Sequence, residues 1–327
     1  MSIGATELLV DPEPGIDSVE LVAGEVTARS PLQLFWRRFR SDRVSMASAI
    51  FIILLIIVAI AAPLIVKILG LPSPYANNLN ALDAFGSPTG PSAAHPFGVD
   101  ELGRDILSRV IYGARVSLEV GIFGTAIATV IGTVMGLAAG FYRGWVDTII
   151  SRTLDVFLAF PVLVLGLGIG AACGVRGCAG GLIQPGLGTV IFIIALSSFT
   201  YIARIARGQV LSLREKEFIE ASRSLGASNT RILFRELLPN LVAPLIVYSS
   251  LLIPTNILFE AALSFLGVGI RPPTASWGQM ISEASPIFTT AWWYMVFPGV
   301  ALLLTVLAFN LVGDGLLDAL NPRGDSR

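Results

Sequence analysis

The stretch KEFIEASRSLGASNTRILFRELLPN, residues 216–240, is the longest charged and amphipathic run in a chain that is otherwise mostly apolar. Before Gly226 the spacing predicts one short helix, and after it a second apolar stripe predicts another, which we expect Pro239 to end. The apolar face of the first helix is formed by Phe218, Ala221 and Leu225. The stretch therefore indicates a short helix-turn-helix to which another protein can bind. An interfacial elbow that only anchors the neighbouring helices is the alternative.

The composition of the whole chain places this stretch in a membrane protein. Of 327 residues, 54% are hydrophobic and only 14% are charged, whereas a soluble domain carries about 25% charged residues. A helical span needs about 20 mostly apolar residues. We therefore expect an all-α polytopic membrane protein with six transmembrane helices. The candidate spans are 45–66, 117–141, 153–173, 189–206, 242–266 and 292–313.

The distribution of Lys and Arg predicts the orientation of these spans. If the N-terminus is inside, most of the 22 Lys and Arg residues fall in inside segments, as the positive-inside rule requires. We therefore expect both termini, and residues 216–240, in the cytoplasm. The first 28 residues contain no Lys or Arg, unlike a signal peptide. Residues 1–30 are expected to be a disordered cytoplasmic tail, and 324–327 a second, shorter one.

Residues 31–44 join aromatic side chains to four arginines. This pattern suits an amphipathic helix at the inner leaflet, with rings among the lipid tails and arginines among the headgroups. A basic flank that only sets the orientation is the alternative reading. The transmembrane domain then covers 45–323, with a long outside loop at 67–116 and cytoplasmic helices at 214–240.

The second half of the outside loop contains candidate polar contacts. Asp100 and Arg104 have the i,i+4 spacing of an ion pair on a short helix, which we expect to plug the outer rim rather than to contact substrate. His95 is the only histidine, so we expect no histidine-based metal site or catalytic pair within this chain.

Two spans contain residues that predict local geometry. Gly132, Gly136, Gly140 and Gly144 recur every four residues, which favours close packing against another helix. In the third span Pro161 is expected to kink the helix.

Three polar residues in the spans are candidates for the translocation path. Glu260 lies in an apolar run, where a carboxylate is costly, so we expect it to face the bundle interior or a wet cavity. It then either lines a pore or is hydrogen-bonded to backbone or a neighbouring serine; Ser264, one turn later, shares its helix face. Asp155 is the third candidate, although an ion pair with Arg152 is the preferred reading.

Cys173 and Cys178 are the only cysteines, and they are separated by five positions on the expected outer face. Because that face is oxidising, they are candidates for a small disulfide loop. Free thiols at the membrane edge are the alternative.

The opening stretch resembles the EAA loop of ATP-binding-cassette (ABC) importer permeases. That pattern reads Glu-Ala-Ala, three residues, Gly, nine residues, an apolar residue, one residue and Leu-Pro. The matching positions here are Glu220-Ala221-Ser222, Gly226 and Leu238-Pro239. Ser222 replaces the second alanine, and Glu236 stands where isoleucine is usual.

The segment before the second span narrows the resemblance to the C-type permease of dipeptide, oligopeptide and nickel importers. The matching positions are Gly98, Asp100, Gly103-Arg104-Asp105, Ser108-Arg109 and Tyr112-Gly113-Ala114-Arg115. Val99 departs from the usual threonine. The resemblance runs over about residues 31–323.

The resemblance implies a type I ABC-importer permease fold and half of a translocation path for di- or oligopeptides. Nickel chelates and other small polar solutes are the alternative cargo. It also implies a second, B-type permease, two ATPase subunits and an external substrate-binding protein, assembled in the lipid of the bacterial inner membrane. Phe218 and Leu225 would then enter a groove of the ATPase, and Glu220 would pair with a basic residue or cap the turn. No nucleic acid is expected as a partner.

The positions of the two lysines argue against ATP hydrolysis through a phosphate loop in this chain. Neither Lys67 nor Lys216, the only two, follows glycine, so no GxxxxGK[ST] phosphate loop is present. We therefore expect a subunit that is not an enzyme and binds no cofactor, with ATP and Mg on partner ATPases. A self-contained channel or secondary transporter is the rival, but it would carry several ionisable groups at mid-membrane, where Glu260 is nearly alone. A membrane enzyme is disfavoured because no catalytic set is visible.

Overall fold

The computed structural model describes residues 31–320 except residue 175. The expected tails at 1–30 and 324–327 lie outside the described residues. Across the described part, helices and loops make up the chain, and the only extended pairing consists of isolated bridges. The all-α prediction is therefore confirmed.

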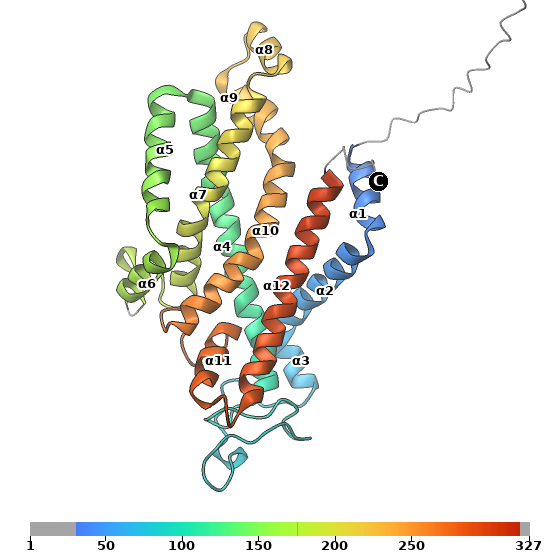
Figure 1. Ribbon diagram of the computed structural model, residues 1–327, viewed down its shortest axis with the longest axis vertical. Coiled ribbons are helices and arrows are strands. Elements are labelled where there is room, and N and C mark those ends of the chain that lie inside the picture. Colours follow the sequence, from blue (N-terminus) through green and yellow to red (C-terminus); the bar gives the residue numbers. More distant parts are fainter. Residues whose placement is uncertain (1–30, 175, 321–327) are drawn as a thin grey trace, which may run out of the picture.

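The long helices run side by side in one bundle (Figure 1). Five are long and apolar enough to cross a membrane, and a sixth candidate is a bent pair of helices, α5 and α6, that meet at 86°. The six-span prediction is confirmed if that bent pair counts as one span. The spanning helices are α2 (Arg43–Ile60), α4 (Ile106–Tyr142), α5 (Gly144–Ala159) with α6 (Val162–Cys173), α7 (Leu187–Leu213), α10 (Leu238–Phe265) and α12 (Trp292–Leu320).

The bend between α5 and α6 has a local cause in the sequence. Phe160 has φ −84° and ψ 133°, the extended conformation that a following proline imposes. Pro161 also lacks the N–H that an uninterrupted helix would need. The expected kink at Pro161 is therefore confirmed, and it is sharp enough to divide the span into two helices.

Glycines set the close packing of α4 on α7. A Cβ on Gly132 would lie 2.6 Å from the Phe199 carbonyl oxygen, and one on Gly136 would lie 2.5 Å from Ala206 Cβ. Gly140 faces Val210 in the same way, so the predicted packing stripe is confirmed for three of its members. Gly144 is the exception, because it is the first residue of α5, has φ +57°, and a Cβ added to it would meet nothing within 4 Å.

The expected amphipathic helix is present as α1 (Pro31–Ser41). It packs against α12, where Gly315 leaves room for Phe39 and Ser45. Arg40 lies 5.8 Å over the ring of Trp36. Whether α1 lies at a membrane interface stays a prediction. The first span differs slightly from expectation, because α2 ends at Ile60 and a separate short helix, α3 (Ala62–Ile68), follows.

The end of the molecule that carries α3 is completed by the loop to α4, by η1 (Leu79–Ala81), α11 (Trp277–Ala284) and η4 (Ser285–Ile287). The predicted Asp100–Arg104 pair is present, with 2.6 Å between Oδ2 and Nε. It does not lie on a short helix, because Asp100 and Arg104 occupy the turn before α4. The predicted separate plug helix is also wrong: α4 begins at Ile106 and continues through the second span, so the loop is shorter than 67–116.

A second arginine extends this ion pair into a buried network. Arg109 is fully buried and donates to Glu283 of α11 at 2.8 Å, while Arg104 reaches the same carboxylate at 3.3 Å. Tyr294 also donates to Glu283. Burial alone would lower the pKa of Arg104, but the carboxylates of Asp100 and Glu283 outweigh it and raise that pKa above its ordinary value. The network ties the loop before α4 to α11 and α12.

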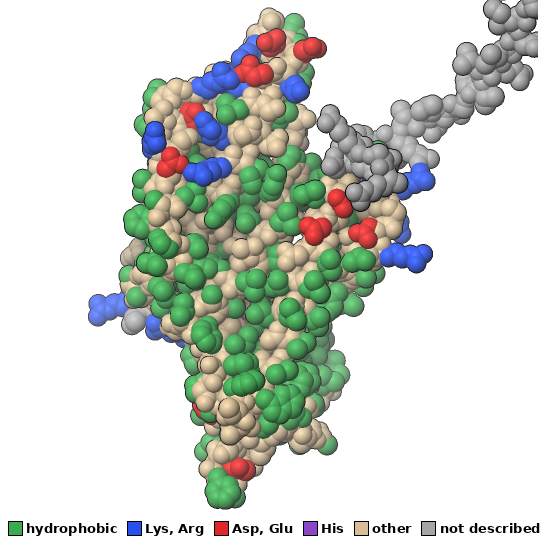
Figure 2. Space-filling view, in the orientation of Figure 1, with side chains coloured by type: hydrophobic (Ala, Val, Ile, Leu, Met, Phe, Trp, Pro, Cys, Tyr) green, Lys and Arg blue, Asp and Glu red, His purple; other side chains and the backbone are tan. Residues whose placement is uncertain are grey.

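Apolar and charged side chains occupy different parts of the surface. Figure 2 shows apolar side chains over the middle of the visible face, and charged ones gathered mainly near α8 and around α1. This is the distribution expected of a protein that crosses a bilayer.

Candidate coupling site

The site begins at α8 (Glu217–Ser224), which stands at one end of the molecule (Figure 1). The helix ends in a Schellman motif, in which Gly226 N donates to Arg223 O and Ala227 N donates to Ser222 O. Gly226 has φ +76°, a conformation that side chains other than glycine and asparagine adopt only with strain. The predicted turn at Gly226 therefore rests on its backbone conformation.

One face of α8 has no cover. Leu225 is 88% exposed and Phe218 is also exposed, as is Ala221; Ser222 is half-buried. Glu220 is exposed, and no ion pair or side-chain hydrogen bond joins it to another described residue. The residues that the sequence assigned to a partner are thus accessible on the isolated chain.

The opposite face of α8 is anchored in the bundle by a residue that the sequence analysis missed. Ile219 is fully buried and packs in a cluster with Phe141 of α4 and Val210 of α7. That cluster also contains Ile232 and Leu237. The missed signal was an isoleucine next to Phe218, on the face opposite the exposed one. Ile219 fixes α8 to the ends of α4 and α7.

Cations strengthen the same attachment. Arg214 donates to the carbonyl oxygens of Gly140 and Phe141, at 3.1 and 2.8 Å, at the C-terminal end of α4. Burial, and then the like charges of Arg143 and Arg223, lower the pKa of Arg214, although a guanidinium stays charged at neutral pH. Arg223 of α8 lies 5.9 Å over the Phe141 ring. Ile219 and Arg223 thus place α8 against Phe141 at the end of α4, and Arg214 ties that end to the end of α7.

The second helix of the opening stretch does not end at Pro239, as we expected. The chain is helical from Asn229 to Phe265, through α9 (Asn229–Arg231), the π-helical η3 (Ile232–Leu237) and α10. In η3 the Leu238 N–H bonds to the Leu233 carbonyl, a wider turn that accommodates the proline ring. Asn240 Nδ2 donates to Glu236 O at 2.6 Å, so this carbonyl close to the proline has a side-chain donor. Pro239 thus joins the coupling stretch to α10.

Glu260 supports the hydrogen-bonded reading. It is fully buried, and its Oε1 accepts from Ser264 at 2.7 Å and from Ser276 at 2.9 Å, while Ser117 lies 3.3 Å from Oε2. Ser264 is equally enclosed and accepts from the Ile270 N–H at 3.0 Å. Both residues are buried in this conformation, and a place for Glu260 and Ser264 on the translocation path stays a prediction. They join α10 to α4 and to the start of α11.

Asp155 lies in a more open setting. The expected pair with Arg152 is present at 3.5 Å, but the shorter contact, at 2.7 Å, is to Arg204 of α7. Arg207, one turn after Arg204 on α7, donates to Asp147 through two hydrogen bonds of 2.6 and 2.8 Å. These residues line a cavity of about 540 Å³ between α5 and α7. A place for Asp155 on the path stays a prediction.

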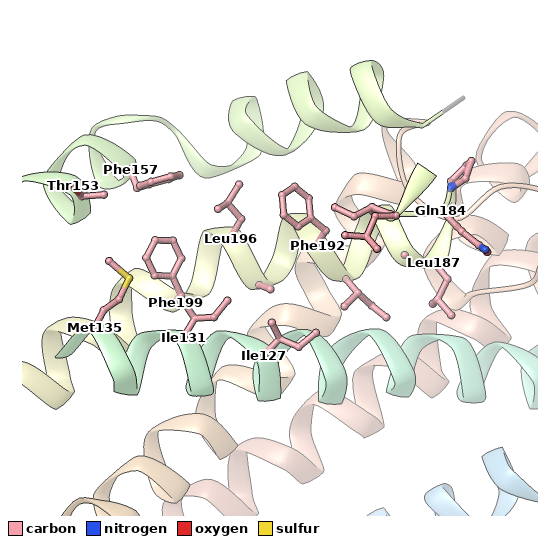
Figure 3. A pocket seen from close by; sticks show the side chains of 16 residues that line it. Ile127, Ile131, Met135, Thr153, Phe157, Gln184, Leu187, Phe192, Leu196 and Phe199 are labelled. Carbon is pink, nitrogen blue, oxygen red and sulfur yellow. The ribbon is translucent and has the colours of Figure 1, made fainter. Parts of the chain in front are cut away.

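A larger cavity of about 730 Å³ lies between α5, α7 and α4. Figure 3 shows apolar side chains from all three helices around it. The labelled ones include Phe157 of α5, Phe192, Leu196 and Phe199 of α7, and Ile127, Ile131 and Met135 of α4. The lining residues include no ionisable side chain, so this cavity suits apolar groups rather than the charged end of a peptide.

Cys173 and Cys178 are joined as a disulfide, with their Cα atoms 5.0 Å apart. The bond closes the turn that follows α6 and precedes η2 (Ala179–Gly181). Within the described residues, no group of three or more His, Cys, Asp or Glu side chains is placed to hold a metal ion.

The fold and the coupling site together define a multi-pass helical subunit of a larger membrane transporter. Two family models match the chain. One is described as the binding-protein-dependent transport system inner membrane component and matches residues 128–325; the other is the N-terminal TM domain of oligopeptide transport permease C, at 30–88. The chain belongs to this family of inner membrane components and is a permease of an ABC importer.

Individual proteins agree with the family models. The glutathione transport system permease protein GsiD of Escherichia coli O6:K15:H31 is 45% identical over 295 residues, which cover 90% of this chain and 91% of the relative. The same protein of Shigella boydii serotype 4 and of Shigella sonnei matches equally well. Among solved structures, the inward-facing MetNI methionine ABC transporter matches 66% of this chain and 98% of its own, with a TM-score of 0.55 at 20% identity. That likeness confirms the fold.

Proposed function

We propose that this chain forms half of a translocation path for di- or oligopeptides and that separate ATPase subunits drive it through α8. The peptide cargo is supported by two names: the relatives are glutathione permeases, and the N-terminal family model is one of oligopeptide transport. Nickel chelates and other small polar solutes are the alternative cargo. A second permease of B type and an external binding protein complete the assembly.

The observation that carries this proposal is the two-sided construction of α8. Its exposed face holds Leu225 and Phe218, and its buried face is anchored by Ile219. An exposed apolar side chain next to a rigid anchor suits docking to another protein. On this proposal α8 and both termini lie in the cytoplasm, ATP and Mg are bound by the ATPases, and this chain is neither catalytic nor a cofactor-binding subunit.

The test uses the complete transporter reconstituted in liposomes, with uptake of a labelled dipeptide and ATP hydrolysis both measured. Leu225→Asp is expected to abolish uptake and to release the ATPase subunits. The stability of the chain should change by no more than about 0.5 kcal/mol, because the side chain is exposed. Leu182→Asp, the same change at a side chain that is 85% exposed outside the coupling stretch, is the matched control and should leave the ATPase subunits bound.

Two substitutions at Gly226 distinguish the effect of backbone strain from that of a bulky side chain. Its Cβ position is open on the isolated chain, so Gly226→Leu is expected to insert in the membrane but to lose coupling. Gly226→Asn tolerates the left-handed backbone and should retain more coupling than the leucine variant. Uptake without ATP by the isolated chain, or full uptake with Leu225→Asp, would overturn the proposal and favour a self-contained channel or secondary transporter.

A further inference from the structure

The large apolar cavity between α4, α5 and α7 lies beside the bend that separates α5 from α6. Because α6 leaves the line of α5 at 86° and packs against α10, where Gly166 leaves room for Leu263, it does not cover α7 as a straight continuation of α5 would. The cavity is also open along α4, where Ile127 and Ile131 line it and are 43% and 42% exposed. This chain therefore leaves part of its spanning surface hollow.

The dimensions of the cavity fit one hydrocarbon chain and exclude a helix. Its lining on α7 runs from Leu187 to Phe199 (Figure 3). At about 1.5 Å per residue that stretch is about 18 Å long, close to the roughly 15 Å of hydrocarbon in one leaflet. A volume of about 730 Å³ over this length gives a mean cross-section of about 40 Å², half the area of a helix about 10 Å across. The space is too narrow for a helix of another subunit.

The side chains around the cavity decide what can fill it. The lining includes no ionisable group, and its polar side chains are Thr153 and Gln184, which lie toward opposite ends in Figure 3. Thr153 donates its hydroxyl to Ile149 O at 2.9 Å, whereas the side-chain amide of Gln184 is exposed and has no hydrogen-bond partner among the described residues. Water does not fill an apolar cavity of this kind, and the apolar solvent inside a bilayer is lipid hydrocarbon.

The end of the cavity at Gln184 lies next to a cation. Cys178 N donates to Ile183 O at 2.9 Å, so the disulfide turn that carries Arg176 rests against the cavity lining at Ile183. Arg176 is the only charged residue in the stretch 156–203. It is exposed, and no ion pair joins it to another described residue.

A second arginine reaches the same turn. Arg271 comes from the segment after α10, and its Nη2 lies 2.9 Å from the position that a Cβ on Gly174 would occupy. Arg271 is exposed and has no ion pair with another described residue. Two cations without carboxylate partners beside a cavity of acyl-chain width match the phosphate of an anionic phospholipid.

We propose that this cavity binds an anionic phospholipid, with one acyl chain between α4, α5 and α7 and the phosphate at Arg176 and Arg271. The amide of Gln184 donates to an ester oxygen of the same lipid, between the chain and the phosphate. The second acyl chain stays in the bilayer. The site goes beyond the proposed function, because its occupancy depends on neither cargo nor ATP.

The experiment is native mass spectrometry of the complete transporter, released from nanodiscs that contain equal amounts of phosphatidylglycerol and phosphatidylethanolamine. Wild type is expected to retain phosphatidylglycerol in preference to phosphatidylethanolamine. Gly188→Leu puts a side chain into the cavity, because a Cβ there meets nothing closer than Gln184 Cβ at 3.8 Å, and leucine is a better helix former than glycine. Retained lipid should fall about tenfold, since every displaced CH₂ weakens binding.

The headgroup contact is tested separately. Arg176→Gln removes one cation and leaves the cavity unchanged, so lipid should still be retained. Its preference for phosphatidylglycerol over phosphatidylethanolamine should fall about fivefold, the effect of one basic side chain on an anionic lipid.

Each variant has a matched control. Gly168→Leu makes the same change on α6, where a Cβ meets nothing within 4 Å and the residue does not line the cavity, and should retain lipid like wild type. Arg152→Gln removes an arginine that is 80% exposed on α5 and should keep the lipid preference. If Gly188→Leu retains as much lipid as wild type, or instead releases the second permease, the inference is overturned. An unchanged preference in Arg176→Gln overturns the headgroup contact.

Discussion

The two ends of the molecule hold their exposed apolar side chains in different ways. Leu225 and Phe85 are the two most exposed large apolar side chains among the described residues. Leu225 follows a short helix that is fixed by one buried isoleucine and by arginines at helix ends. Phe85 lies on a hairpin whose neighbouring loop is locked to α11 and α12 by buried charges. The α8 end is therefore the easier one to displace, and the opposite end is the more rigid.

The largest effect is expected from removing Arg109, the buried cation that ties α4 to α11 at the end opposite α8. Arg109→Met removes a fully buried guanidinium and leaves the half-buried carboxylate of Glu283 without its closest cation, so we expect a loss of about 3 kcal/mol of stability, at the lower end of the cost of breaking a buried pair. The measurement is thermal or denaturant unfolding of the detergent-solubilised subunit. The control is Arg115→Met, which breaks the exposed pair with Glu119 and should cost no more than about 1 kcal/mol. Equal effects of the two changes would show that the network does not lock this end.

A second change addresses the anchor of α8. Ile219→Ala removes a fully buried side chain and should destabilise the local packing by about 2–5 kcal/mol. We expect faster hydrogen exchange of the α8 amides and ATP hydrolysis that no longer drives uptake. Phe218→Ala, on the exposed face, is the matched variant.

Phe218→Ala should leave hydrogen exchange unchanged and reduce only the coupling to the ATPases. If Ile219→Ala transports normally, α8 does not need a fixed position relative to α4 and α7.

The smallest effect is expected inside the bundle, at Glu260. Glutamine fills the same space and still accepts from the serines, so Glu260→Gln should cost about 1 kcal/mol. Uptake should fall only in proportion to the loss of folded protein. A selective loss of uptake, with an unchanged unfolding temperature, would instead return Glu260 to the translocation path.

Local signals in the sequence predicted the geometry of individual helices well. Pro161 predicted the break between α5 and α6, and three glycines of α4 predicted close packing against another helix, which the structure identifies as α7. Each effect depends on a backbone property of one residue. Pro239 misled for the complementary reason. Whether a proline ends a helix depends on how the preceding turn is wound, and the π-helical turn before it is not visible in residue type alone.

Contacts between segments far apart in the chain could not be predicted from the sequence. The partner of Arg109 is Glu283, 174 positions later, and the partners of Glu260 come from α4 and from the start of α11. The sequence indicated that a carboxylate inside the bundle needs partners, but only the fold decides which serines supply them. The same holds for Asp155, whose closest cation, Arg204, lies on another helix.

The unbroken course of α4 has a consequence for how the permease works. Its 37 residues, at about 1.5 Å per residue, make a rod of about 55 Å. One end of the rod is capped by Asp105, next to the buried charges, and the other is held by Arg214. If α8 is the docking element proposed above, a push on α8 is carried along this single helix to the ion-pair network at the opposite end of the molecule.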